Sequence, residues 1–199
     1  MRKLITLFLI LFSSVVYGAN HFYDVREFAI EGVKLGMTYE EAKVAALKNM
    51  ELNESDITLP GENEHKITGE IFHSEFILQT RKHGRVHTEL RVLMIENVSK
   101  NQETDRSVVV NEIRFNRPID IVNSALARRY VKEHYDSPAI VRNGKHLNLE
   151  WCNKIDIDPN YERCHPDAAN LSLLETLLVL NNPKYLISLQ EYVSNKANK

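Results

Sequence analysis

The segment from Val86 to Met94 places the tightest limit on the fold that this chain can adopt. Two sets of residues alternate along it: Val86, Thr88, Leu90, Val92 and Met94 on one side, and His87, Glu89 and Arg91 on the other. Successive side chains of a strand point to opposite faces, so the pattern predicts a strand with one buried and one solvated face. Such strands are typical of antiparallel sheets.

Other segments also favour extended structure. Residues 66–80 are rich in isoleucine, phenylalanine and threonine, Gly84 marks a turn, and Val108–Phe115 and Leu171–Leu180 are β-rich runs. Residues 139–142 and 145–151 flank Asn143-Gly144, a dipeptide suited to a tight hairpin turn. Trp151 alternates with Leu147 and Leu149 in the second of these strands, which indicates a core residue, with ligand stacking as the alternative.

Helix signals occur at three places. Thr38 and Glu41 have the spacing of a reciprocal capping box, which predicts a helix from Tyr39 to about Lys48. Its expected buried stripe consists of Ala42, Ala45, Ala46 and Met50. Pro118 and Asp120 open a second predicted helix that Ser137-Pro138 ends, and residues 184–194 are expected to form a helix or a strand.

The order of these elements favours an α+β fold with helices packed on an antiparallel β-sheet. We expect residues 20–199 to form one such domain, with two similar helix-plus-meander halves, 20–117 and 118–199, as a possible subdivision.

The first nineteen residues are typical of a cleavable signal peptide. Arg2 and Lys3 precede an apolar run from Leu4 to Phe12, and cleavage is expected after Gly18 or Ala19. The apolar run is shorter than the roughly 20 residues of a membrane-spanning helix, and an uncleaved anchor is the alternative. The sequence thus predicts a soluble periplasmic or secreted protein without stable membrane insertion.

Charge makes nucleic acid an unexpected partner. The chain has 25 basic and 27 acidic residues, and removal of Arg2 and Lys3 with the leader changes the net charge from −2 to −4. No basic stripe of the kind that nucleic-acid binders carry stands out.

Cys152 and Cys164 are the chain's two cysteines. In an oxidising compartment they are expected to pair with each other, and free thiols or an intermolecular bond are the alternatives. Such a bond would stabilise the fold by about 2 to 3 kcal/mol.

Residues 30–42, which read Ile-Glu-Gly-Val-Lys-Leu-Gly-Met-Thr-Tyr-Glu-Glu-Ala, resemble the helix start of small exported bacterial domains. These include the SmpA/OmlA family of outer-membrane assembly lipoproteins and the related β-lactamase-inhibitor-protein-like fold. The resemblance implies a periplasmic domain that acts by binding other proteins. This chain lacks the lipid-anchoring cysteine and is longer than one such domain, and no functional residue carries over.

Two patterns suggest metal sites. Asp156, Asp158, Asn160, Glu162 and Asp167 echo the spacing of a calcium loop, although Pro159 and Tyr161 replace residues that such a loop needs, and a solvated acidic turn is the alternative. His83 and His87 bracket a turn, with His65 and His73 on the preceding segment, so zinc or copper is a further possibility beside that of exposed hairpin histidines.

The leading functional hypothesis is a binding protein without catalytic activity or cofactor, whose partner is another envelope or secreted protein. The sequence shows no nucleophile elbow, no zinc-protease helix and no phosphate-cradling glycine loop, so no catalytic residue is assigned. An exported metal-binding protein and an enzyme of unrecognised family are the alternatives.

Overall fold

A computed structural model describes residues 24–66, 68–98, 107–116, 135, 138, 140–143, 147–161, 163–174 and 177–197. Eight strands form the main sheet: β3 (Ile57–Thr58), β6 (Glu75–Lys82), β7 (Arg85–Glu96), β8 (Val108–Asn116), β9 (Ile140–Asn143), β10 (Leu147–Trp151), β13 (Asn170–Leu174) and β14 (Leu177–Asn181). Three small ribbons are β1 (Ala29–Ile30) with β2 (Val33–Lys34), β4 (Glu62–Glu64) with β5 (Ile71–His73), and β11 (Ile157–Asp158) with β12 (Arg163–Cys164). The helices are α1 (Tyr39–Met50), α3 (Pro183–Ala197) and the 3-10 turns η1 (Val25–Glu27), η2 (Glu54–Asp56) and η3 (Lys154–Asp156).

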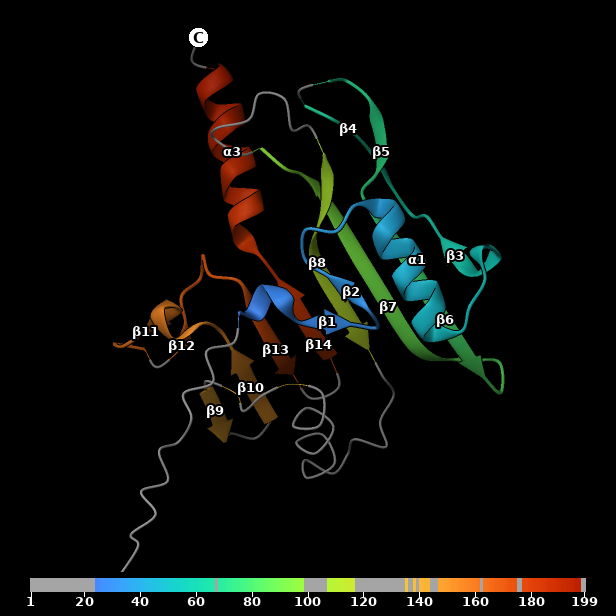
Figure 1. The fold of residues 1–199 in the computed structure, drawn as a ribbon, viewed down its shortest axis with the longest axis horizontal. Helices are drawn as coiled ribbons and strands as arrows, with labels where there is room; N and C mark the ends of the chain where they lie inside the picture. The colour runs from blue at the N-terminus through green and yellow to red at the C-terminus, as the bar shows by residue number, and fades with distance from the viewer. Residues whose placement is uncertain are drawn as a thin grey trace, which may run out of the picture.

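Every neighbouring pair in the main sheet is antiparallel, in the order β3-β6-β7-β8-β14-β13-β10-β9. Two meanders, β6-β7-β8 and β10-β13-β14, meet where β8 pairs with β14 (Figure 1). The predicted strand Val86–Met94 is confirmed and forms most of β7.

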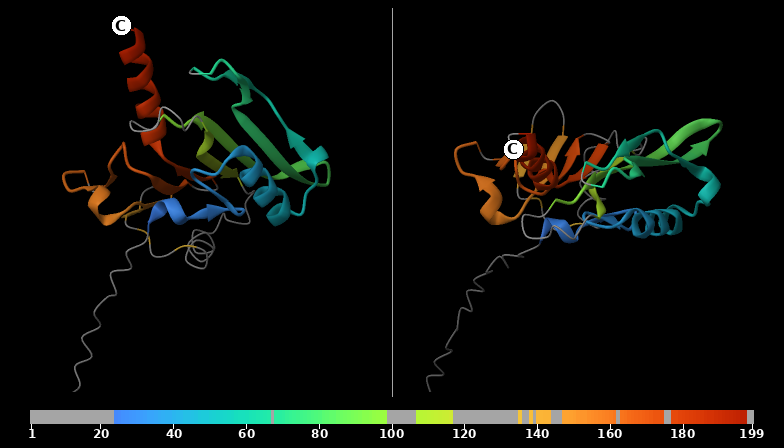
Figure 2. Two further views of the ribbon diagram at one scale, coloured as in Figure 1. Left: turned by 45° about the horizontal axis from the view of Figure 1, so that its top comes forward. Right: turned by 90° about the horizontal axis from the view of Figure 1, so that it is seen from above.

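The strand registers line up the core in two rows. One row crosses the sheet through Phe76, Val92, Ile113, Leu180, Leu171 and Trp151, and the other through Leu78, Leu90, Phe115, Leu178, Leu173 and Leu149. All twelve side chains are buried. They share one face of the sheet, and Figure 2 shows η1, β1, β2 and α1 along one side of it.

The segment around Gly36 fastens α1 to the sheet. The Gly36 N–H donates to the Val110 carbonyl at 2.8 Å, and the Val110 N–H donates to the Met37 carbonyl at 2.8 Å. Thr38 and Glu41 form the predicted capping box. The predicted helix is thus confirmed, and it extends two residues beyond Lys48.

The expectation of an α+β fold with helices packed on an antiparallel sheet is wrong, whereas the possible halves 20–117 and 118–199 stay a prediction. The described residues are mostly β, and their two α-helices do not form a covering layer. Of the buried hydrophobic residues, α1 supplies only Ala42 and Ala46, and α3 supplies none. The strands supply most of the core, because a local helix signal does not specify how much of the helix surface is buried.

Several finer expectations can be compared with the structure. Residues 183–197 form a helix, and Leu171–Leu180 divides into β13 and β14. The hairpin of β9 and β10 is confirmed, with Asn143 opposite Leu147, while residues 144–146 lie outside the described part. The leader, residues 1–19, and most of the helix expected from Pro118 also lie outside it. The single domain 20–199 stays a prediction.

Cys152 and Cys164 form the expected disulfide, with their Cα atoms 5.9 Å apart. It spans the β11–β12 ribbon and joins that ribbon to the end of β10. Trp151, next to it, is fully buried, as predicted for a core residue. Across the described residues, no helix combines the length and apolar character needed to span a bilayer.

Candidate functional site

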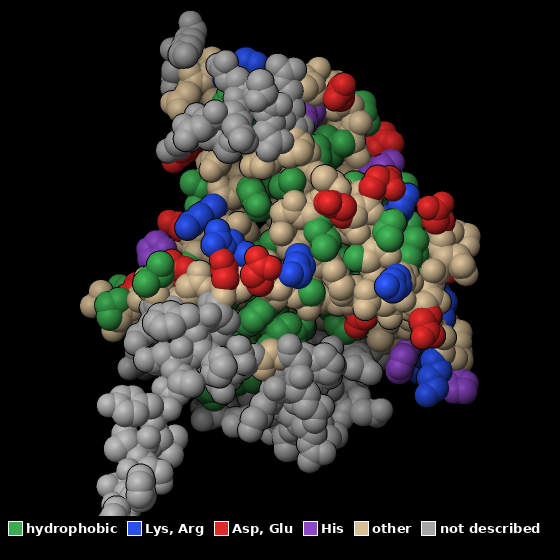
Figure 3. Space-filling model, viewed as in Figure 1, with side chains coloured by type: hydrophobic (Ala, Val, Ile, Leu, Met, Phe, Trp, Pro, Cys, Tyr) green, Lys and Arg blue, Asp and Glu red, His purple; other side chains and the backbone are tan. Residues whose placement is uncertain are grey.

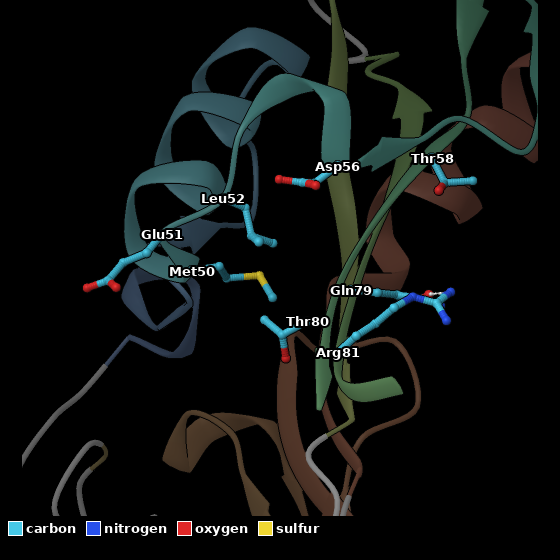
Figure 4. A pocket seen from close by; sticks show the side chains of 8 residues that line it. All are labelled: Met50, Glu51, Leu52, Asp56, Thr58, Gln79, Thr80 and Arg81. Carbon is cyan, nitrogen blue, oxygen red and sulfur yellow. Dashed lines mark hydrogen bonds between the residues drawn. The ribbon is translucent and has the colours of Figure 1, made fainter. Parts of the chain in front are cut away.

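A groove of about 570 Å³ lies between the end of α1 and strand β6 (Figure 4). Its lining residues are Met50, Glu51, Leu52, Asp56, Thr58, Gln79, Thr80 and Arg81. Met50 and Leu52 point from the end of α1 toward β6, whereas Glu51 points away (Figure 4). The groove therefore has apolar contacts from Met50 and Leu52, and its charged side chains are Asp56 on the side of η2 and Arg81 on β6.

Local backbone geometry shapes the helix side of this groove. Glu51 ends α1 in the left-handed conformation at φ 55°, and the Leu52 N–H donates to the Leu47 carbonyl at 3.0 Å. The chain then turns through η2, where the Asp56 carboxylate accepts the Asn53 N–H at 2.8 Å. This turn directs the chain into the two-residue strand β3.

The strand side of the groove is an open sheet edge. β3 pairs with Ile77 and Leu78 only, and within the described residues no strand lies on that side of the last four residues of β6, Gln79–Lys82. An unpaired edge presents backbone N–H and C=O groups to which another extended chain can bond. The groove thus borders four residues of exposed strand edge.

The polar side chains of this edge are held in place by their neighbours on β7. Gln79 donates to the Glu89 carboxylate at 2.7 Å and accepts from Arg81 at 3.3 Å. The hydroxyls of Thr80 and Thr88 lie 2.6 Å apart. Because these contacts fix the side chains before any ligand arrives, little rotamer entropy would be lost on binding.

The β6–β7 hairpin ends in a cationic turn next to the groove. His83 and Gly84 both have positive φ, 52° and 76°, which gives the tight turn that Gly84 predicts. We call residues Arg81–His87 the basic tip, because they include Arg81, Lys82, Arg85 and two histidines but no carboxylate. Figure 3 shows blue and purple side chains gathered at this end of the molecule.

The four histidines singled out in the sequence lie in two different places. His83 and His87 belong to the basic tip, whereas His65 and His73 belong to the β4–β5 ribbon and its connecting turn. His65 is buried, and its Nδ1 lies 3.4 Å from the Glu96 carboxylate. The predicted set of four is thus divided between the two ends of the β6–β7 hairpin.

The His65–Glu96 pair is a buried polar contact that sequence reasoning missed. Glu96 accepts the Lys66 N–H at 2.8 Å, and His65 Nδ1 accepts the Thr68 N–H at 3.2 Å. Both side chains therefore organise the turn that joins β4 to β5. Glu96 follows Val92 and Met94 on the inward-facing side of β7. A carboxylate at such a position of the alternating pattern was the sequence signal for this buried contact.

The acidic loop forms a short ribbon. Asp156 in η3 and Asp158 in β11 are partly exposed, Asn160 and Asp167 are exposed, and Glu162 lies outside the described part. The Asp158 side chain accepts the Asn160 N–H at 2.9 Å, a turn-forming bond. Within the residues that the structure describes, no three His, Cys, Asp or Glu side chains are grouped so that they could hold a metal ion.

Asp24 and Tyr185, which both interact with Arg26, have shifted pKa values. The bonded Arg26 guanidinium lowers the pKa of the Asp24 carboxyl, and burial raises the pKa of the Tyr185 hydroxyl at the start of α3. Asp24 also accepts the Arg26 N–H at 3.0 Å, which caps η1. Both shifts have a local structural cause.

Comparisons with protein-family models, with curated proteins and with solved structures found no match. The resemblance of residues 30–42 to SmpA/OmlA-like domains accordingly stays a prediction, and the functional argument depends on the geometry of the groove and the basic tip.

Proposed function

We propose that this chain is an exported, non-catalytic binding protein that takes up an extended segment of another protein along the open edge of β6. One observation carries this proposal: the four strand residues Gln79–Lys82 have no described strand on the side away from β7, and they lie next to the groove. Strand addition of this kind supplies affinity through backbone hydrogen bonds and specificity through pockets for alternate side chains.

The groove supports this role because it can receive a side chain from the incoming strand. Met50 and Leu52 provide apolar contacts, and Thr58 and Thr80 flank them with hydroxyl groups. The β6 edge therefore offers both backbone groups and side-chain contacts to a partner.

Export and the class of partner come from the sequence and the disulfide. The leader pattern of residues 1–19 predicts passage to the periplasm or the cell exterior, and the Cys152–Cys164 bond is compatible with an oxidising compartment. In that location the available partners are envelope and secreted proteins. The resemblance of residues 30–42 to exported binding domains points the same way.

A phage-displayed library of random short peptides, selected on the full mature chain, tests the proposal. We expect selected peptides to slow amide hydrogen exchange at Gln79–Lys82, because new backbone bonds form there. Peptides that bind without changing exchange at these residues, or a library that yields no binder, would overturn the proposal.

Thr58→Trp tests whether the groove takes part. Thr58 is exposed in β3 and lines the groove, so an indole at this position should fill the space and weaken peptide binding by roughly tenfold or more. Ser194→Trp, at an exposed position of α3, is the matched control and should leave binding unchanged. Equal binding by both variants, with melting temperatures showing that both are folded, would remove the groove from the site.

A further inference from the structure

The basic tip carries cations that the fold itself does not use. Lys82 and Arg85 are direct cross-strand partners in the hairpin, and like charges at such positions destabilise a sheet. Arg81 precedes them on the same edge, and all three residues are exposed.

Two arginines elsewhere on the same sheet are paired with carboxylates. Arg91 lies 3.7 Å from the carboxylates of both Glu75 and Glu89, and Arg114 is bonded to Glu112. Over the described part of the chain, no ion pair involves Arg81, Lys82 or Arg85. The sheet thus neutralises its inner cations and leaves those of the tip available to an external anion.

The groove wall beyond the tip has the opposite sign. Asp56 lines it at the end of η2, whereas Glu51 points away (Figure 4) and Glu54 is paired with Lys43 at 3.3 Å. Because Ile57, which follows Asp56, lies opposite Leu78, a ligand along the β6 edge would meet cations at the tip and the Asp56 carboxylate at the other end. The distance between them is short, because Gln79–Lys82 spans only about 10 Å at 3.3 Å per strand residue.

We propose that the segment bound along β6 is a dipolar peptide of about six residues, acidic where it passes the basic tip and basic where it passes Asp56. This inference rests on the proposed function, since it names the chemistry of the partner at the same edge. A uniform polyanion such as nucleic acid fits less well, because Asp56 and the net negative charge expected of the mature chain would both repel it.

A second copy of this chain is the competing occupant of the edge, because antiparallel pairing of two β6 strands would place the basic tip of each copy near Asp56 of the other. Charged residues on an open edge limit such self-association in natural sheets. A separate peptide can present several carboxylates to Arg81, Lys82 and Arg85, whereas Asp56 supplies one. The peptide therefore matches the charge of the tip better than a second copy does.

The test uses synthetic peptides of alternating valine and threonine, capped at both ends, with glutamates clustered at one terminus and lysines at the other. Both chain directions are made, together with a peptide of the same composition in which the charges are interspersed. We expect one dipolar peptide to bind roughly tenfold or more tightly than the interspersed one, with an affinity that falls as salt rises. It should also slow hydrogen exchange at Gln79–Lys82.

The variant R81E/K82E/R85E should weaken binding of that dipolar peptide by roughly tenfold or more and improve binding of a lysine-rich peptide. The variant K66E/K184E/K196E makes the same change in net charge at exposed positions away from the groove. It should leave the binding of both the dipolar and the lysine-rich peptide unchanged. Thermal melts establish that both variants are folded.

The outcomes separate the two proposals. If peptides bind the β6 edge whatever their charge order, the proposed function stands and the dipolar partner is wrong. If no peptide protects Gln79–Lys82, both are wrong. Tighter binding of duplex DNA or a heparin oligosaccharide at the tip, unaffected by Thr58→Trp, or a dimer in sedimentation that protects this edge, would also overturn the dipolar partner.

Discussion

The two meanders of the sheet differ in the length of their strands. Strands β6, β7 and β8 have 8, 12 and 9 residues, whereas β10, β13 and β14 have 5 each. The long strands continue past the buried rows into an exposed hairpin, and the short strands end close to the core. The difference separates a part of the sheet that extends beyond the buried rows from a part that mainly completes the core.

The two meanders are also fastened differently. α1 lies beside the first and is attached through Gly36, Met37 and the Thr38 cap, whereas the second is joined to the β11–β12 ribbon by the Cys152–Cys164 bond. Both contribute to one hydrophobic cluster, in which Phe76 and Trp151 stand at opposite ends of the same row. The comparison predicts that the two meanders unfold as one cooperative core. The attachment of α1 and the disulfide should each add stability on their own, and substitutions in the basic tip should change the stability little.

Trp151→Ala should have the largest effect. The side chain is fully buried, and the Tyr135 ring lies 6.2 Å from it, so truncation leaves a large cavity and should destabilise the protein by about 3 to 5 kcal/mol. Urea unfolding followed by circular dichroism measures the loss, since this variant lacks the chain's one tryptophan. Phe76→Ala in the first meander should cost a similar amount.

Both core variants should unfold in a single transition, because the rows of buried residues run through both meanders. A second transition that Trp151→Ala leaves unchanged would instead show that residues 20–117 and 118–199 fold as separate halves.

Removal of the disulfide should come next. The double variant C152A/C164A frees a loop that the bond closes over 12 residues, and this should lower stability by about 2 to 3 kcal/mol. Chemical denaturation of the variant beside the oxidised parent gives the difference. An unchanged denaturation midpoint would mean that the short meander needs no fastening beyond its core.

Local patterns predicted the elements whose causes are themselves local. The alternation around Leu90 and Val92 specifies a strand whatever its neighbours are, and the Thr38–Glu41 box requires only one turn of helix. Cys152 and Cys164 could be paired because the sequence offers no other cysteine. These parts of the fold needed no knowledge of strand order.

The groove and the fold class depend on long-range arrangement. Met50 and Thr80 are thirty positions apart, and they meet only because β3 stops after two residues and leaves the β6 edge open. No periodicity marks a strand as an edge strand. The charge run from Arg81 to Arg85 was visible in the sequence, but its meaning depends on which strand lies beside it.

Thr38→Ala tests the fastening of the first meander. The hydroxyl accepts the Glu41 N–H at 3.4 Å and donates to the Glu41 carboxylate at 2.9 Å, and loss of such a cap costs about 1 kcal/mol. Urea unfolding of the variant and the parent measures this cost. A loss as large as that of the disulfide variant would mean that the two fastenings contribute equally.

The cap should also respond to pH. The Thr38 N–H holds the pKa of the Glu41 carboxyl below its ordinary value of 4.5. A lowered folded pKa means that this contribution is present above the ordinary value and disappears as pH falls through the folded value. Glu41→Gln should therefore reduce stability near neutral pH, and the difference from the parent should shrink in acid.

Lys82→Glu should have the smallest effect on stability, with a sign opposite to the other variants. It replaces the cross-strand pair of Lys82 and Arg85 by one of opposite charges, which should stabilise the hairpin by about 0.2 to 1 kcal/mol. The same change should weaken binding of the dipolar peptide, because it removes a cation from the tip. Urea unfolding and peptide titration of one preparation measure both effects. A clear loss of stability would mean that Lys82 has a structural role. A more stable protein that binds the peptide more weakly would show that the like charges of the tip serve binding and lower the stability of the sheet.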